Sequence, residues 1–190
     1  FDRIFEKFFA SKDLKGQVLL DLGPGQYDFA VLAKERGAET QAIDNDPAVL
    51  ELGRYRGYTV ADARIQDIHP ELFAQAFDGL FCKFSINAFW YWEDERKQVE
   101  FLDRLLSVAK PDAWLWIAPW NGVPKAGVDR QTERQTLQVQ AEYFRRAGCA
   151  AIDLGASLAR YFGVNGNVAN NVVFVRGLEM DATLSARRLF

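Results

Sequence analysis

Short apolar runs alternate with longer segments of helical period along the chain. The runs at residues 17–21, 40–44, 58–61, 78–84 and 113–118 show little alternation of polar and apolar positions. Such runs are typical of strands buried on both faces, as in a parallel sheet. Between the runs, apolar residues recur every three or four positions, which predicts amphipathic helices. The pattern therefore predicts an α/β fold built from repeated strand–helix units.

The predicted helices have recognisable start and stop signals. They are expected around residues 5–9 and 29–37, after Asp46, over about 93–109 and over about 130–148. Asp46 supplies an N-cap oxygen, and Pro47 occupies a first turn where its missing N–H is not needed. Pro111 is expected to end the fourth helix, and Gly148 to close the fifth.

Two apolar runs, residues 151–154 and 171–175, follow the last predicted helix. We expect no helical segment between them that is long enough for a parallel crossover, so the two strands should pair as an antiparallel hairpin. This ending separates the predicted fold from most dinucleotide-binding folds.

Length and charge narrow the function classes. The 190 residues suit one domain, and we expect a single domain over residues 1–190 whose N-terminus is incomplete, since the chain begins with Phe1. The 23 basic and 26 acidic residues give a net charge of −3 without a basic block, which argues against nucleic acid as the partner. The longest apolar stretch, residues 113–120, is far shorter than a membrane span, so no membrane partner is expected. Cys82 and Cys149 are interpreted as two reduced core thiols, and a cytoplasmic location is expected.

Candidate chemistry begins where the first strand ends, at the glycine-rich segment 21–27. A glycine-rich turn between a buried strand and a helix lets the backbone approach a ligand and directs free helix N–H groups toward it. Asp44 ends the next strand about 20 residues later, where a carboxylate can accept both hydroxyls of a ribose. Asp62 ends the third strand, at the height of an adenine ring. These features favour a nucleotide-like ligand, although both acids could also serve only as caps of helices or turns.

At these residues the sequence resembles the class I S-adenosylmethionine-dependent methyltransferases. The resemblance rests on residues 21–25, 42–47 and 61–63 and on Phe77-Asp78 at the start of the fourth strand, and it covers nearly the whole chain. It implies a Rossmann-like doubly wound α/β fold with a seven-stranded sheet of order 3-2-1-4-5-7-6, in which strand 7 is antiparallel. It also implies that S-adenosyl-L-methionine lies across the ends of strands 1 to 4.

The resemblance assigns cofactor-binding roles to individual residues. Gly23 and Gly25 would lie against the methionine part, and Asp21 would reach its amino group directly or through water. Asp44 would bind the ribose hydroxyls. The full implied set is Asp21, Gly23, Pro24, Gly25, Tyr27, Asp44, Asn45, Asp62, Ala63, Lys83 and Phe84, with Asp62 and Ala63 at the adenine and with Lys83 and Phe84 lining the cofactor through backbone atoms. Tyr27 stands where the family usually has a third glycine, and we expect it to narrow the approach to the turn.

Aromatic residues after the fourth and fifth strands are the candidate acceptor site. The segment 86–92 and Trp120-Asn121-Gly122 lie where the family places the methyl acceptor. The expected acceptor-binding residues are Asn87, Phe89, Trp90 and Trp120, and the expected partner is a small, largely apolar or aromatic molecule. Trp90 and Trp92 could equally pack the following helix onto the sheet. Trp114 and Trp116 alternate within a buried strand and are expected in the core. The stretch 161–167 could close over the acceptor or be only a flexible turn.

The expected reaction is an in-line displacement on a sulfonium methyl, driven mainly by proximity. We name no catalytic residue, and His69 is the single histidine. No metal is expected, because residues 83–85 and 119–121 offer no carboxylates after strands 4 and 5. Residues 85–89 lack the prolines of the enzymes that methylate amino groups of nucleic-acid bases, so base methylation is disfavoured.

Two alternatives stay open. One is a non-catalytic S-adenosylmethionine-binding or interaction domain. The other is a nicotinamide-dependent oxidoreductase, although the Tyr-x-x-x-Lys pair that this class often needs is absent, since no tyrosine has a lysine four residues later. The oligomeric state is also open.

Overall fold

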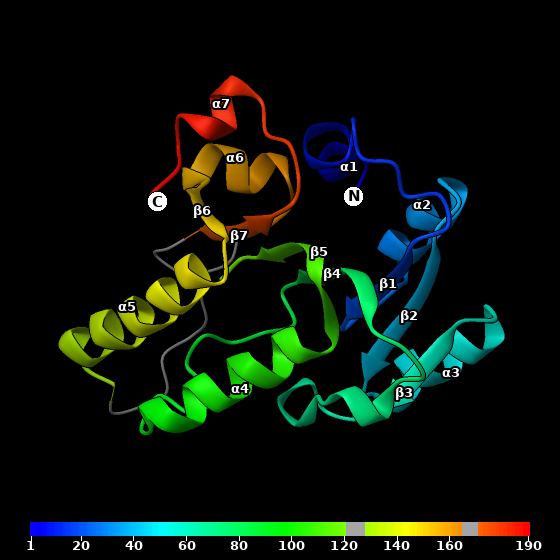
Figure 1. Cartoon of the computed structure of the whole chain (residues 1–190), viewed down its shortest axis with the longest axis horizontal. Helices are drawn as coiled ribbons and strands as arrows, with labels where there is room; N and C mark the ends of the chain where they lie inside the picture. The colour runs from blue at the N-terminus through cyan, green and yellow to red at the C-terminus, as the bar shows by residue number, and fades with distance from the viewer. Residues whose placement is uncertain (121–127, 165–170) are drawn as a thin grey trace.

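The computed structural model describes residues 1–120, 128–164 and 171–190. Within them, seven strands form one sheet in the order β3-β2-β1-β4-β5-β7-β6 (Figure 1). Strands β1 to β5 pair in parallel, whereas β7 is antiparallel to both β5 and β6. The strands are β1 (Val18–Leu22), β2 (Glu39–Asp44), β3 (Thr59–Asp62), β4 (Phe77–Lys83), β5 (Ala109–Ala118), β6 (Ala150–Asp153) and β7 (Val172–Arg176). The predicted α/β class, strand order and antiparallel strand are confirmed.

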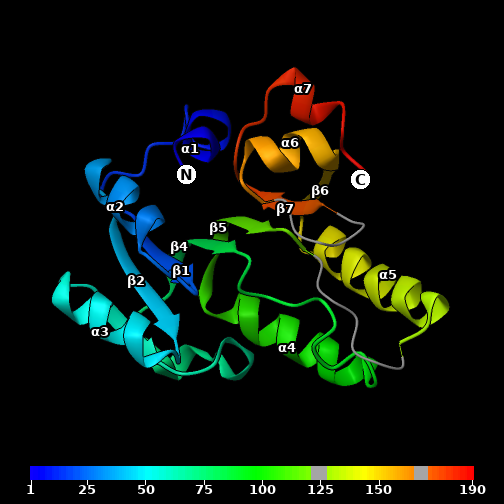
Figure 2. The same ribbon diagram turned by 180° about the vertical axis from the view of Figure 1, so that it is seen from behind.

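Helices cover both faces of the sheet (Figures 1 and 2). They are α1 (Asp2–Phe8), α2 (Asp28–Glu35), α3 (Pro47–Tyr55), α4 (Glu95–Ser107), α5 (Arg130–Arg146), α6 (Gly155–Tyr161) and α7 (Ala182–Ser185), with short 3-10 turns at Ile65–Asp67 and Pro70–Leu72. Asp46 caps α3 as predicted, because its carboxylate accepts a hydrogen bond from the backbone N–H of Ala48. Asp94, Asp129 and Asp181 cap α4, α5 and α7 with the same chemistry.

Two large apolar clusters hold most of these layers together, and a smaller third cluster packs α3 against Tyr27, Ala30 and Ala42. One joins the sheet to α1, α2, α6 and α7 and includes Trp114 and Trp116, which are 1% and 0% exposed, so their predicted place in the core is confirmed. The other joins the opposite face to α4 and α5. Both cysteines are buried free thiols, and burial raises the pKa of Cys82 to about 12. None of the described helices combines the length and the apolar character needed to cross a membrane.

The boundary between α4 and β5 differs from the prediction. The helix ends at Ser107, and β5 begins at Ala109, which pairs with Phe77. The register then shifts so that Gly79 pairs with Trp114, and the extra residues of β5, Pro111 among them, form a bulge. Proline is tolerated in a bulge because no ladder hydrogen bond is required from it there. Interpreting Pro111 as the residue that ends the helix was therefore wrong.

The C-terminal region contains two helices that the sequence pattern did not reveal. α6 lies between β6 and β7, and α7 follows β7. The antiparallel pairing of β6 with β7 is nevertheless as predicted. Residue 161 is the last of α6, whereas residues 165–167 of the predicted closing stretch lie outside the described residues.

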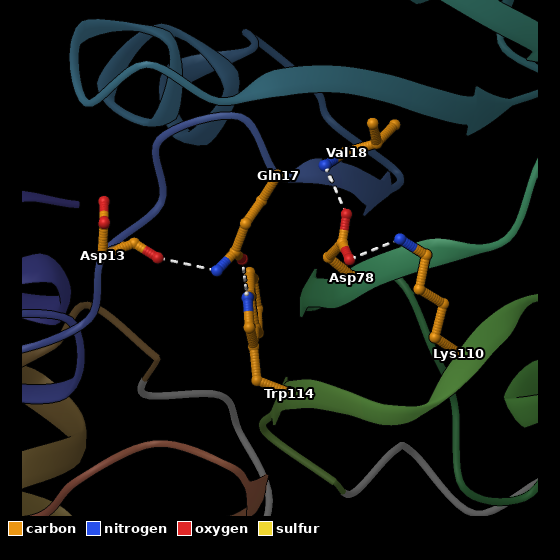
Figure 3. Close-up of polar contacts among 6 residues, drawn as sticks. All are labelled: Asp13, Gln17, Val18, Asp78, Lys110 and Trp114. Atoms are coloured by element: carbon orange, nitrogen blue, oxygen red, sulfur yellow. Dashed lines mark hydrogen bonds and ion pairs between the residues drawn. The ribbon is translucent and has the colours of Figure 1, made fainter.

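Polar contacts join the strands at the edge opposite their carboxyl ends (Figure 3). The carboxylate of Asp78 accepts from the backbone N–H of Val18 at 2.8 Å and from Nζ of Lys110 at 2.6 Å. Burial acts to raise the pKa of Asp78, but these two contacts outweigh it and lower the pKa. Asp78 therefore ties β1, β4 and β5 together at the base of the sheet, away from the candidate site.

Trp114 packs directly on the backbone of Gly79. Its indole N–H donates to Oε1 of Gln17 at 2.9 Å (Figure 3), which fixes the ring. A Cβ atom at position 79 would lie 1.9 Å from Cε2 of the ring. Gly79→Ala should therefore lower the free energy of unfolding by about 1–3 kcal/mol, as measured by urea denaturation. In a double-mutant cycle, Trp114→Phe should reduce the cost of Gly79→Ala, because phenylalanine has a smaller ring. If Gly79→Ala alone changed the free energy of unfolding by less than about 0.5 kcal/mol, the predicted overlap with the Trp114 ring would be refuted.

Candidate functional site

The backbone of the glycine turn after β1 has a conformation that allows a ligand to approach it closely. Gly23 and Gly25 have φ angles of 69° and 53°, in the left-handed region. The hydroxyl of Ser85, just beyond β4, donates to the carbonyl oxygen of Gly23 at 3.0 Å, and a Cβ at position 23 would lie 2.1 Å from that hydroxyl oxygen. A Cβ at position 25 would meet no atom within 4 Å. The turn is thus fixed to the end of β4 on one side and open to a ligand at Gly25.

Tyr27 has the left-handed backbone conformation that glycine adopts most easily. Its φ angle is 61°, while its side chain is fully buried and its hydroxyl donates to the carbonyl of Val49 at 3.0 Å. Its ring stacks on Tyr58, with 5.0 Å between the centroids. Burial is the largest cause that raises the pKa of Tyr27 to about 12, and the negative charges of Asp44 and Asp21 contribute to it. The expectation that this ring narrows the turn is wrong, because the ring packs beside α3; a backbone contact with the cofactor stays a prediction.

Asp21 is a buried carboxylate in β1, 2% exposed. Its Oδ2 atom has no hydrogen-bond partner among the described residues. Burial raises the pKa of Asp21 well above its ordinary value of 3.8, and the negative charges of Asp28 and Asp44 raise it further. A buried acid without a partner is costly, so a cation placed beside it would be stabilised strongly.

The predicted acids Asp44 and Asp62 end two neighbouring strands. They face each other in the register of β2 and β3, and the backbone N–H of Ala63 donates to the carbonyl of Asp44 at 3.1 Å. Oδ1 of Asp44 accepts from the backbone N–H of Asp46 at 2.9 Å, so Asp44 does cap a turn. Asp44 is half-buried, whereas Asp62 and Asn45 are exposed. The structure therefore brings Asp21, Asp44 and the glycine turn to one edge of the sheet, where α/β folds bind ligands.

The end of β4 offers side chains as well as backbone atoms. Phe84 has a φ angle of 70° and a ring that is 49% exposed. The ammonium of half-buried Lys83 lies 4.2 Å from the centroid of the Phe1 ring and 5.9 Å from that of Phe84. The sequence pattern did not single out these side chains or the hydroxyl of Ser85 as candidates, because only tertiary contacts distinguish them from ordinary residues at a strand end.

The four predicted acceptor residues divide into two pairs. Phe89 and Trp120 are 2% and 3% exposed, and the Trp120 indole N–H donates to Oε1 of Gln140 at 2.8 Å. Their side chains are core groups in this structure, so Trp120 offers no ring surface to a ligand. Asn87 and Trp90 are half-buried, and Oδ1 of Asn87 accepts from the backbone N–H of Phe89. Residues 121 and 122, also expected to line the acceptor site, lie outside the described residues.

Two other features do not add to this site. A groove between α4 and α5, lined by Val99, Val139 and Tyr143 among others, contains none of the predicted site residues. The described residues include no group of three or more His, Cys, Asp or Glu side chains that could hold a metal ion. The metal-free reaction stays a prediction.

No protein-family model and no curated protein matches the sequence. The fold, however, is similar to that of solved methyltransferases. A TehB-like S-adenosylmethionine-dependent methyltransferase from Corynebacterium glutamicum superposes with a TM-score of 0.56 at 14% identity, over 91% of this chain and 85% of that chain. An amino pentose methyltransferase from Micromonospora echinaspora gives 0.56 at 15% identity, over 92% and 87%. Magnesium protoporphyrin IX methyltransferase from Synechocystis gives 0.54 at 13% identity, over 89% and 74%. The chain therefore has the fold of the class I S-adenosylmethionine-dependent methyltransferases.

Proposed function

We propose that the protein binds S-adenosyl-L-methionine and transfers its methyl group to a small-molecule acceptor. The observation that carries this proposal is the buried Oδ2 atom of Asp21, which lies beside a glycine turn and has no hydrogen-bond partner among the described residues. The methionine part of the cofactor carries an ammonium group, which would give this carboxylate a charge-assisted hydrogen bond. The residues present thus fit the cofactor, because its ammonium would lie beside the buried Asp21 carboxylate, where an uncompensated negative charge costs the most free energy.

The other predicted residues would hold the rest of the cofactor. The open approach at Gly25 suits the methionine chain, and Pro24 and Tyr27 would contribute backbone atoms of the same turn. Asp44 would accept the ribose hydroxyls while its Oδ1 atom keeps the turn at Asp46 in place. Further proposed contacts are Asn45 beside the ribose, Asp62 and Ala63 at the adenine, and backbone atoms of Lys83 and Phe84.

When bound, the cofactor would supply an electrophilic methyl group: a lone pair of the acceptor would form the new bond to the methyl carbon, the electron pair of the broken C–S bond would stay on sulfur, and any acceptor proton would pass to solvent. The residues of this chain would bind and orient the two molecules, which can account for most of the rate enhancement of such a reaction. Asn87 and Trp90 are the proposed acceptor contacts that keep exposed surface. Two fold neighbours are named as sugar methyltransferases, which supports a small acceptor.

Calorimetry with S-adenosylhomocysteine, the demethylated product, tests the proposed function. We expect wild-type protein to bind this ligand and not to bind NAD. Binding of NAD without S-adenosylhomocysteine would establish the nicotinamide alternative. Transfer of a labelled methyl group to a panel of small acceptors then tests turnover, in the presence of EDTA because no metal is expected. Binding without transfer to any acceptor would favour the non-catalytic alternative.

A further inference from the structure

Lys83 is a half-buried cation without a polar partner in the described part of the chain. Lys7 and Lys110 each pair with a carboxylate, whereas the Lys83 ammonium has no ion pair or hydrogen bond among the described residues and lies near the rings of Phe1 and Phe84. Burial lowers the pKa of Lys83, and the nearby charge of Asp28 acts in the opposite direction. Aromatic faces offset part of the cost of removing an ammonium from water, but they do not replace its hydrogen bonds.

Lys83 lies at the strand end that is joined to the glycine turn, and its ammonium is close enough to Asp28, at the start of α2, to be affected by that charge. Lys83 is the last residue of β4, and Ser85, two residues later, bonds to the carbonyl of Gly23 in the glycine turn. Near the end of α6, a Cβ at position 163 would lie 3.6 Å from the Lys83 ammonium, so the chain after α6 also approaches it.

Phe84 adds an exposed apolar surface to the same place. Its left-handed backbone, with φ of 70°, is a strained conformation for a residue with a bulky side chain. Such strain concentrates at ligand-binding sites. Its ring remains 49% exposed rather than packing into the core. Lys83, Phe84 and Phe1 together form the Lys83 cluster.

We propose that the Lys83 cluster binds the methyl acceptor, and that the acceptor is an aromatic carboxylic acid. This inference rests on the proposed function and names its substrate class. The carboxylate would accept hydrogen bonds from the Lys83 ammonium, and the aromatic body would lie against Phe84. Charge-assisted bonds are about twice as strong as neutral ones, and a half-buried site screens them less than water does. A cationic acceptor would be repelled by the same ammonium.

Fluorine NMR with para-fluorobenzoate and para-fluorobenzamide tests this inference, because the two probes differ mainly in charge. In wild-type protein saturated with S-adenosylhomocysteine, we expect the benzoate to bind at least about tenfold more tightly than the amide. Lys83→Met should remove this preference, and Lys83→Arg should keep most of it. Phe84→Ala should weaken both probes. Lys34→Met, at an exposed lysine of α2, is the matched control and should change neither affinity.

Three results would overturn the inference: equal affinity of the two probes in wild type, an unchanged preference in Lys83→Met, or loss of the preference in Lys83→Arg. If Lys83→Arg loses the preference, and if the acid side of the pH–rate profile is shifted in wild type but not in Lys83→Arg, then Lys83 would act as a proton acceptor instead. Repeating the probe titrations without S-adenosylhomocysteine lets the proposed function and the proposed acceptor class fail separately. Failure of the wild-type protein to bind S-adenosylhomocysteine contradicts the methyltransferase function. Loss of the preference for the benzoate over the amide contradicts only the acceptor class.

Discussion

Asp21→Asn is expected to stabilise the protein while weakening its affinity for S-adenosylhomocysteine. The carboxylate is buried, and its Oδ2 atom has no hydrogen-bond partner in the described structure. Replacing it with an uncharged amide of the same shape should raise the free energy of unfolding by about 1–3 kcal/mol at about pH 8. For a chain of this size that is a rise of roughly 2–12 °C in Tm. The same change removes the charge proposed to pair with the ligand ammonium, so affinity should fall at least about tenfold.

The pH dependence of the stability effect follows from the raised pKa of Asp21. Because its pKa in the folded protein lies above the ordinary value of 3.8, the folded state binds this proton more tightly than the unfolded state does. Wild-type stability should therefore fall as pH rises above 3.8 and through the folded pKa, and Asp21→Asn should escape that loss. The stability difference between variant and wild type should grow over this window and then level off.

Thermal denaturation across this pH range, paired with calorimetry, measures both effects of Asp21→Asn. Asp112→Asn is a suitable control, because Asp112 is an exposed carboxylate on β5 and its replacement should change stability by less than about 0.5 kcal/mol. An Asp21→Asn protein that is less stable than wild type at about pH 8 would contradict the assignment of Asp21 as an uncompensated acid. Unchanged ligand affinity would contradict its proposed role.

Asp44→Ala should reduce affinity for S-adenosylhomocysteine by at least about tenfold. A carboxylate that accepts two ribose hydroxyls contributes roughly 1.5–3 kcal/mol per bond, and alanine can accept neither. The measurement is calorimetry at one pH, with circular dichroism to establish that the variant is folded.

Asp46→Ala is the matched control for Asp44→Ala. Asp46 caps α3 by accepting from the backbone N–H of Ala48 at 2.8 Å, so its loss should cost about 1 kcal/mol of stability. Its ligand affinity should nevertheless stay within about threefold of wild type, since it has no proposed contact with the ribose. Equal losses of affinity in the two variants would mean that Asp44 acts only through the turn that it shares with Asp46.

Local patterns were sufficient for most of the fold. The unalternating apolar runs of β1, β2 and β4 reflect burial on both faces, which is a property of each strand, and the cap at Asp46 is a contact between near neighbours. The errors fall where distant contacts override local preference. Pro111 is accommodated because β5 bulges against β4, and α6 packs its short apolar face on the cluster that also contains α1.

The same distinction between local patterns and distant contacts applies to the candidate site. The glycine turn and the acids at the ends of β1, β2 and β3 were recognisable, since strand ends and turn residues are encoded by neighbours in the chain. The burial of Trp120, the direction of the Tyr27 ring and the contact of the Lys83 ammonium with the Phe1 ring were not recognisable. Each depends on groups tens of residues away, such as Gln140 for Trp120 and Val49 for Tyr27. Residue types along the chain thus specify which edge of the sheet carries the candidate site, whereas long-range packing determines which side chains are left accessible there.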